Sequence, residues 1–141
     1  MTISYENPWI YNGQIVDSGV LENYIGFVYN ITNLTNDKKY IGKKLLKFSR
    51  TKQVKGKKKK ILIESDWKNY YGSSKELQAD ITELGVFSFK REILEFCKTK
   101  GYCNYLEAKL QFNHNVLERD DYYNGWISVK VGRSHVPKKP T

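Results

Sequence analysis

Two short stretches decide how this chain folds: Gly26-Phe27-Val28-Tyr29 and Lys39-Tyr40-Ile41-Gly42. The first lies within Tyr24 to Ile31, which is rich in the aromatic and β-branched residues that favour strands. Between the two stretches, Asn33 to Asp37 has the composition of a turn. The pattern therefore predicts a β-hairpin in which each strand carries one glycine and one tyrosine.

The chain beyond residue 72 predicts a helix followed by a third strand. Apolar residues recur at helical spacing from Leu77 to Leu84, after Ser73 or Ser74 as a cap and before Gly85 as a stop. The spacing of aromatic and β-branched residues then indicates a strand within Val86 to Phe96.

A second helix is expected to start after Asn104, and Trp126 to Val131 reads as a late strand. This order predicts an α/β sandwich, with a three-stranded, mainly antiparallel sheet flanked by helices. We expect residues 1–23 to be an irregular N-terminal segment packed on the body, residues 24–134 to be the domain, and residues 135–141 to be a flexible tail.

The chain has 141 residues, of which 40% are hydrophobic, so it can build the core of one domain. Its two cysteines form no disulfide framework, which favours a reducing, cytoplasmic setting in a bacterial or phage-infected cell. No N-terminal export signal and no apolar run long enough for a membrane span are present, so we expect no membrane partner.

The net charge of +9 comes from one segment, residues 43–60, which holds ten basic and no acidic side chains. These are Lys43, Lys44, Lys47, Arg50, Lys52, Lys55, Lys57, Lys58, Lys59 and Lys60. Like charges at this density repel one another, so a polyanion such as DNA would stabilise the segment. A solvated loop or an anionic membrane surface are the alternatives. We interpret residues 43–65 as a basic insertion, forming either a hairpin arm or a helix up to Arg50.

The two glycine–tyrosine stretches resemble the GIY-YIG nuclease superfamily. Tyr40 follows Tyr29 by eleven residues and Arg50 follows ten residues later, which is the spacing of the family's two strand motifs and its helical arginine. The resemblance implies a GIY-YIG-like sandwich and a metal-dependent DNA endonuclease that hydrolyses phosphodiester bonds. Because glycine lacks a Cβ, we expect Gly26 and Gly42 to let backbone or phosphate approach the tyrosines closely.

The resemblance also implies the catalytic residues. Glu107 would hold one Mg²⁺ or Mn²⁺, Asn124 would shape the site, and Arg50 would neutralise charge on the phosphoryl oxygens. Tyr29 would act as the general base, which requires neighbouring cations to favour its phenolate, and Tyr40 would orient it or relay the proton.

Each of these residues has another interpretation. Glu107 has capping-box spacing with Asn104, and the tyrosines could be ordinary cross-strand packing partners. Lys43, Lys44 or Lys47 could replace Arg50 at the phosphate, and Asn113 or Asn115 could replace Asn124.

One departure from the family concerns the position a turn after the arginine. Many members carry a His or Tyr there, where this chain has Val54, so Tyr70 and Tyr71 are candidate substitutes.

The expected partner is double-stranded or branched DNA. We expect it to contact the lysines of the basic segment, Lys43, Lys44, Lys47, Lys52, Lys55, Lys57, Lys58, Lys59 and Lys60. The family's small stand-alone members include homing, restriction-like and repair nucleases, and the resemblance favours a phage or mobile-element type. The oligomeric state, dimer included, stays open.

Two other functions remain to be weighed against the nuclease. One is a basic nucleic-acid-binding module of the same fold without chemistry. The other is a zinc module that uses Cys97, Cys103 and His114, with or without His135.

Overall fold

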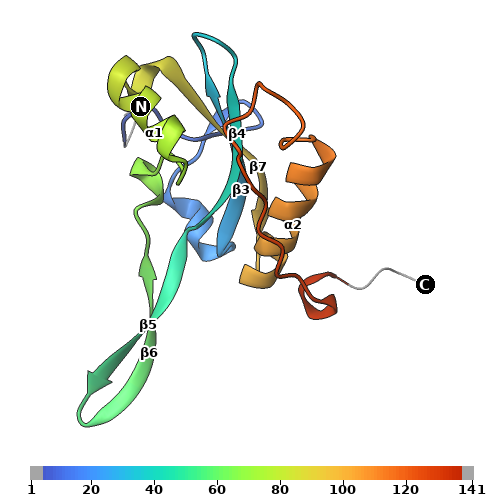
Figure 1. Ribbon diagram of the computed structural model, residues 1–141. Coiled ribbons are helices and arrows are strands. Elements are labelled where there is room, and N and C mark those ends of the chain that lie inside the picture. The colour runs from blue at the N-terminus through green and yellow to red at the C-terminus, as the bar shows by residue number, and fades with distance from the viewer. Residues whose placement is uncertain (1–4, 138–141) are drawn as a thin grey trace.

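The structure is a computed structural model that describes residues 5–137, and it shows a sheet between two helices, with a long hairpin projecting from this body (Figure 1). The strands are β1 (Ile10–Tyr11), β2 (Gln14–Ile15), β3 (Gly26–Asn33), β4 (Lys39–Leu45), β5 (Lys47–Val54), β6 (Lys57–Glu64) and β7 (Phe89–Cys97). The α-helices are α1 (Lys75–Leu84) and α2 (Lys100–Asn113). Short 3₁₀ helices are η1 (Ser18–Glu22), η2 (Trp67–Asn69), η3 (Val86–Ser88) and η4 (Arg133–His135). Among the helices of residues 5–137, none has the length and apolar character needed to cross a bilayer.

The main sheet has the strand order β2-β1-β7-β3-β4. Its centre, β7-β3-β4, is antiparallel, as the sequence predicts, and a bulge shifts the β3–β7 register between Val28 and Tyr29. The α/β fold class is confirmed, although the sheet has five strands instead of three. The two extra strands, β1 and β2, come from the N-terminal segment, which is therefore not irregular throughout.

Alternate residues of β3 point to opposite sides of the sheet, and nearly all of them are buried. Both faces of the sheet are therefore covered. The cluster on the α1 side is rich in aromatic residues, and its buried members are Trp9, Val16, Phe27, Tyr29, Ile31, Leu46, Trp67, Leu77, Phe89, Ile93 and Tyr123. The cluster under α2 contains Val28, Ile41, Cys97, Cys103, Leu106, Val116 and Tyr122. Burying one large apolar side chain stabilises the folded state by roughly 1.5–3 kcal/mol. Because β3 contributes buried side chains to both clusters, it anchors the fold.

The helices begin where capping side chains stand. The Ser74 side chain accepts a hydrogen bond from the Leu77 amide and Gly85 ends α1, which confirms that prediction. The second helix begins earlier than expected, because the Thr99 side chain caps α2 by accepting from the Tyr102 amide at 3.1 Å. Asn104 is therefore inside the helix, and the capping-box interpretation of Glu107 is wrong.

The basic segment forms a β-hairpin, which we call the arm (β5 and β6). Its strands pair antiparallel from Lys47–Glu64 to Val54–Lys57. The turn residues Lys55 and Gly56 have φ of 51° and 77°, the positive values of a two-residue type I′ turn. Of the two structures left open for this segment, the hairpin is correct. The arm is a separate two-stranded sheet that extends away from the body (Figure 1).

The late strand predicted for Trp126 to Val131 is absent from the described chain. Only Tyr122 forms a bridge, parallel to Lys39 at the edge of β4. The tail predicted for residues 135–141 lies outside the described residues from Lys138 onward.

Candidate active site at the edge of the sheet

The site lies along β4, the edge strand of the main sheet, whose outward backbone groups need partners. The Lys39 amide donates to the Asp121 carbonyl at 2.9 Å, and the Tyr123 amide donates to the Lys39 carbonyl at 2.7 Å. Two residues along, the Ile41 amide donates to Asn124 Oδ1 at 3.1 Å, and Asn124 Nδ2 donates to the Ile41 carbonyl at 2.8 Å. The Asn124 side chain thus takes the place of a neighbouring strand, which leaves no room for the predicted late strand.

The next outward position on β4 is Lys43, and its partner comes from α2. Lys43 Nζ lies 3.8 Å from Glu107 Oε1, and both the ammonium and the backbone N–H of Lys43 favour the charged form of this carboxylate. One helical turn after Glu107, Gln111 Nε2 donates to the Ile41 carbonyl at 2.8 Å. The helix α2 therefore presents Glu107 and Gln111 to the same edge that Asn124 covers.

These residues border a cavity of about 650 Å³, which we call the edge cavity. It is lined by Tyr40, Lys43, Ser73, Ser74, Lys75, Glu107, Gln111, Tyr123, Asn124, Gly125, Trp126 and Ser128. Three of the predicted catalytic residues, Tyr40, Glu107 and Asn124, meet here although they are far apart in sequence. Because Asn113 and Asn115 are exposed, Asn124 is the asparagine that the fold brings to the site.

Tyr29 lies directly beneath this cavity in the aromatic core. Its side chain is 1% exposed, and its ring lies 6.2 Å from that of Tyr40 and 6.1 Å from that of Tyr70. Burial raises the pKa of Tyr29 well above its ordinary value, and the neighbouring phenols of Tyr70 and Tyr40 raise it further. These surroundings do not supply the cations that a Tyr29 phenolate requires, and they favour the neutral phenol.

Tyr40 reaches the cavity itself. Its hydroxyl lies 3.1 Å from Ser73 Oγ, within hydrogen-bonding distance. Burial raises the pKa of Tyr40, while the hydrogen bond with Ser73 lowers it in part. Tyr40 is thus a neutral hydrogen-bonding group placed against the space that a substrate would enter.

The two motif glycines have different roles. A Cβ on Gly42 would lie 2.5 Å from Tyr29 Oη and 2.9 Å from Tyr40 Cε2, so Gly42 makes room for both phenols, as predicted. A Cβ on Gly26 would instead lie 2.8 Å from the Lys44 carbonyl oxygen and 3.3 Å from Cys103 Sγ. Gly26 therefore allows close strand packing and does not border the tyrosines, which corrects the expectation for that residue.

Glu107 and Gln111 fit a hard divalent cation. Burial raises the pKa of Glu107, although the Lys43 charge and its backbone N–H oppose the shift. Gln111 is 4% exposed, and its Oε1 finds no hydrogen-bond partner within residues 5–137. Mg²⁺ takes oxygen ligands and is commonly held by one or two carboxylates with water and phosphate oxygens. A half-buried carboxylate beside an unpartnered amide oxygen matches that chemistry.

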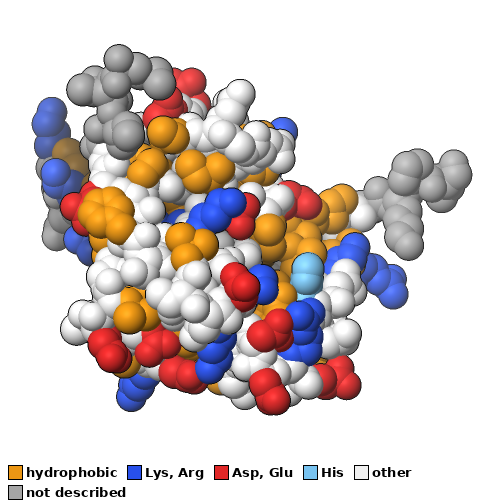
Figure 2. Space-filling model, turned by 90° about the horizontal axis from the view of Figure 1, so that it is seen from above, with side chains coloured by type: hydrophobic (Ala, Val, Ile, Leu, Met, Phe, Trp, Pro, Cys, Tyr) orange, Lys and Arg blue, Asp and Glu red, His pale blue; other side chains and the backbone are white. Residues whose placement is uncertain are grey.

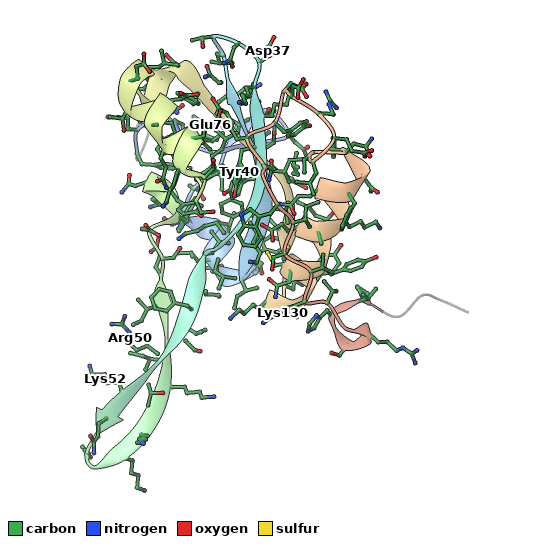
Figure 3. The ribbon with its side chains drawn as sticks, in the orientation of Figure 1. Asp37, Tyr40, Arg50, Lys52, Glu76 and Lys130 are labelled. Carbon is green, nitrogen blue, oxygen red and sulfur yellow. The ribbon has the colours of Figure 1, made fainter. Side chains whose placement is uncertain are left out.

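Arg50 is not part of this group. It lies on β5 of the arm, not on a helix, and its side chain is exposed, with its guanidinium 5.7 Å from the Phe48 ring centre. Figure 3 shows Arg50 and Lys52 on the projecting arm, well separated from Tyr40. The fold instead places two other cations in the edge cavity, Lys43 and Lys75, and of these Lys43 lies beside Glu107.

The lysines predicted to bind DNA divide into two groups. Lys43 and Lys44 are on the body, and Lys47 Nζ, at the arm's root, donates to the Leu21 carbonyl. The other six, which extend along the arm, are exposed: Lys52, Lys55, Lys57, Lys58, Lys59 and Lys60.

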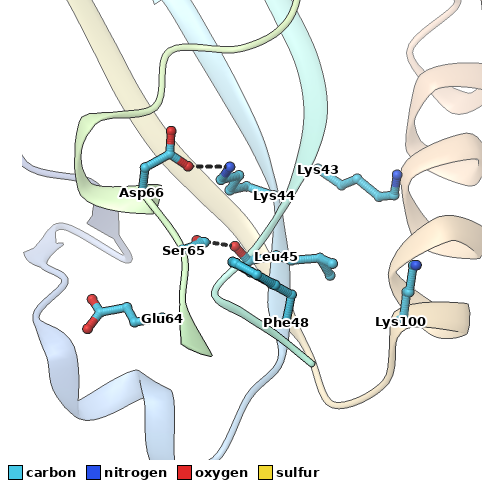
Figure 4. Close-up of a pocket in the computed structure, with 8 residues that line it drawn as sticks. All are labelled: Lys43, Lys44, Leu45, Phe48, Glu64, Ser65, Asp66 and Lys100. Atoms are coloured by element: carbon cyan, nitrogen blue, oxygen red, sulfur yellow. Dashed lines mark hydrogen bonds and ion pairs between the residues drawn. The ribbon is translucent and has the colours of Figure 1, made fainter. Parts of the chain in front are cut away.

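A second cavity, of about 600 Å³, lies where the arm meets the body (Figure 4). It is lined by Lys43, Lys44, Leu45, Phe48, Glu64, Ser65, Asp66 and Lys100. Lys44 Nζ pairs with Asp66 at 2.6 Å and lies 4.1 Å from the centre of the Tyr70 ring. Because Lys43 borders both cavities, positive charge continues from the arm to Glu107.

The structure separates Tyr70 from Tyr71. Tyr70 packs on Tyr29, whereas the Tyr71 ring lies 4.2 Å from the Arg91 guanidinium on the other side of the segment. Tyr70 is therefore the member of the pair that packs with the motif tyrosines, and we call Tyr29, Tyr40 and Tyr70 the tyrosine cluster.

The zinc module is not assembled. Within residues 5–137, no group of three or more His, Cys, Asp and Glu side chains is placed to hold a metal. Cys97 and Cys103 are both buried in the core under α2, while His114 is exposed at the end of that helix.

Sequence reasoning gave no site role to eight of the residues that line the cavity: Ser73, Ser74, Lys75, Gln111, Tyr123, Gly125, Trp126 and Ser128. Gln111 carried a usable signal, because it stands four residues after Glu107 and so on the same helix face. Ser73 was treated only as a cap. Trp126 was assigned to a strand, which hid its exposure.

Comparison with known proteins identifies a family for this chain. The family model described as "Putative endonuclease segE, GIY-YIG domain" matches residues 9–127, most of the chain. Neither the search of curated proteins nor that of solved structures finds a significant match. The matched residues include both tyrosine strands, Glu107 and Asn124. The chain therefore belongs to the GIY-YIG nuclease superfamily.

Proposed function

We propose that this nuclease is a metal-dependent DNA endonuclease whose active site is the edge cavity. The observation that carries the proposal is the convergence of Tyr40, Lys43, Glu107 and Asn124, from three separate segments, on one cavity. The arm supports a DNA substrate, because its exposed basic side chains offer many phosphate contacts.

Glu107 would hold a Mg²⁺ or Mn²⁺ ion, with Gln111 Oε1 as a second oxygen donor. When bound, such an ion polarises the scissile phosphate and stabilises the leaving oxygen. Asn124 and Gln111 both hold the Ile41 carbonyl, so the strand that carries Tyr40 and Lys43 is fixed relative to Glu107.

Lys43 takes the role that the family resemblance gives to Arg50. Its ammonium is 3.8 Å from Glu107, so a phosphate entering beside Glu107 comes within reach of the same cation. Tyr40, hydrogen-bonded to Ser73, positions the attacking water, and the neutral Tyr29 phenol supports the Tyr40 ring from below.

The test is cleavage of supercoiled plasmid and of branched DNA with Mg²⁺ and with EDTA. We expect cleavage only with the metal, and we expect Glu107→Ala to lower the rate by a factor of about 100 or more. Glu83→Ala, which removes an exposed carboxylate from α1 outside the cavity, should cleave at the wild-type rate. Equal cleavage by Glu107→Ala would refute the proposed mechanism. Binding of DNA without cleavage by the wild type would favour a non-catalytic binding module.

A further inference from the structure

Trp126 stands out among the aromatic side chains of the described chain. The other two tryptophans, Trp9 and Trp67, are fully buried, whereas Trp126 is 76% exposed. No other large hydrophobic residue within residues 5–137 is as exposed. A single exposed hydrophobic side chain is ordinary on a protein surface, so the surroundings of Trp126 must decide whether it binds a ligand.

The position of Trp126 identifies the kind of ligand. Its side chain lines the edge cavity together with Tyr40, Lys43 and Glu107, and it directly follows Asn124 and Gly125. A nucleic-acid strand whose phosphate lies against Lys43 and Glu107 would therefore bring a nearby base to this rim. Flat aromatic rings bind bases of any sequence by stacking on their faces.

We propose that Trp126 stacks on an unpaired base beside the scissile phosphate, so that the enzyme prefers DNA that is bulged, branched or otherwise locally unpaired. This inference rests on the proposed function and narrows its substrate class. In an intact duplex both faces of each base are already stacked, and an indole reaches them only by unstacking a step. An unpaired base avoids most of that cost.

The test is binding in EDTA, where no metal-dependent cleavage occurs, to a duplex and to the same duplex with one unpaired 2-aminopurine. We expect the wild type to bind the bulged DNA about 10-fold more tightly and to quench its fluorescence. Trp126→Ala should lose both effects, and Trp126→Phe should retain most of them. Phe87→Ala is the matched control, since Phe87 is 71% exposed but lies in η3 outside the edge cavity.

The outcomes separate the two proposals. If Trp126→Ala keeps the preference and the quenching, the stacking inference is wrong while duplex binding still supports a DNA enzyme. If no variant and no wild-type protein binds either DNA, the proposed function fails first. A dimer in sedimentation that requires Trp126 would also overturn the inference, because the indole would then cover a second copy.

Discussion

Gly42 is the residue on which the tyrosine geometry depends most directly. A Cβ there would lie within 3 Å of Tyr29 Oη, Tyr29 Cζ and Tyr40 Cε2, and the Tyr29 ring is 1% exposed and enclosed by the core. The rings can yield only by moving other core side chains, which typically costs 1–3 kcal/mol. The packing of the two phenols thus requires glycine at position 42, and adding a side chain there should measurably lower the stability of the fold.

We expect Gly42→Ala to lower the free energy of unfolding by about 1–3 kcal/mol and to reduce cleavage, because the displaced Tyr40 no longer faces the cavity. Urea unfolding measures the first effect and the plasmid assay measures the second. Gly132→Ala is the control, because a Cβ at Gly132 meets no atom within 4 Å. If both substitutions leave stability unchanged, the close approach to Tyr29 does not constrain the native protein.

The arm is a separate two-stranded sheet, and its strands pair with each other and not with the main sheet. Lys52 faces Lys59 directly across its two strands, and like charges at such positions destabilise a hairpin. Isolated two-stranded hairpins are at best marginally stable in water. A polyanion would relieve the repulsion, so the arm gains most from binding DNA.

We therefore expect replacement of Lys57, Lys58, Lys59 and Lys60 by Gln to weaken DNA binding and reduce its salt dependence. Each phosphate contact contributes roughly 0.9 to the slope of log affinity against log salt, so losing four contacts lowers the slope by about 3–4. The control removes four exposed lysines from the body, Lys90, Lys98, Lys109 and Lys130, and so changes the net charge equally. Equal slopes for the two variants would assign the effect to total charge and leave no specific role for the arm.

The elements also show where sequence reasoning works. The β3–β4 hairpin and α1 were predictable, because their turn, capping and apolar residues are local signals. The start of α2 was missed because Thr99 is a stronger cap in context than Asn104. The strand assigned to Trp126 failed because the Asn124 and Gln111 side chains bond the edge of β4, which no periodicity reports.

Within the site, Tyr40, Glu107 and Asn124, which the family resemblance implies, line one cavity. The family spacing did not place Arg50 there, because counting residues cannot show that the chain leaves the body at Lys47 and returns at Glu64. Tyr29 shows a related limit, since its pKa depends on enclosure by Tyr70 and other side chains from distant segments.

At the scale of the whole molecule, the residues that carry the excess positive charge differ from those that stabilise the body. The end of the molecule away from the arm shows acidic and basic side chains interspersed (Figure 2). The excess charge lies in residues 43–60, most of it on the arm. The body is instead held by apolar layers and by the buried cation Arg91, which is 0% exposed.

Arg91 joins three parts of the body. From β7 its guanidinium donates to the carbonyls of Glu6 and Asn7 in the N-terminal segment, and to those of Lys68 and Tyr70 before α1. Burial lowers the pKa of Arg91 to about 10, so it stays charged at neutral pH. Since Tyr70 packs on Tyr29, the same side chain links the N-terminal segment to the tyrosine cluster.

We expect Arg91→Met to lower the free energy of unfolding by more than about 3 kcal/mol, because four partly buried carbonyls lose a charged donor at once. Arg91→Lys should recover only part of the loss, since an ammonium lacks the planar fork that reaches both segments. Lys90→Met, at the exposed neighbouring position, should change stability by no more than about 0.5 kcal/mol. Urea unfolding of the three variants measures this order, and full stability of Arg91→Met would show that the apolar layers alone hold the N-terminal segment against the sheet.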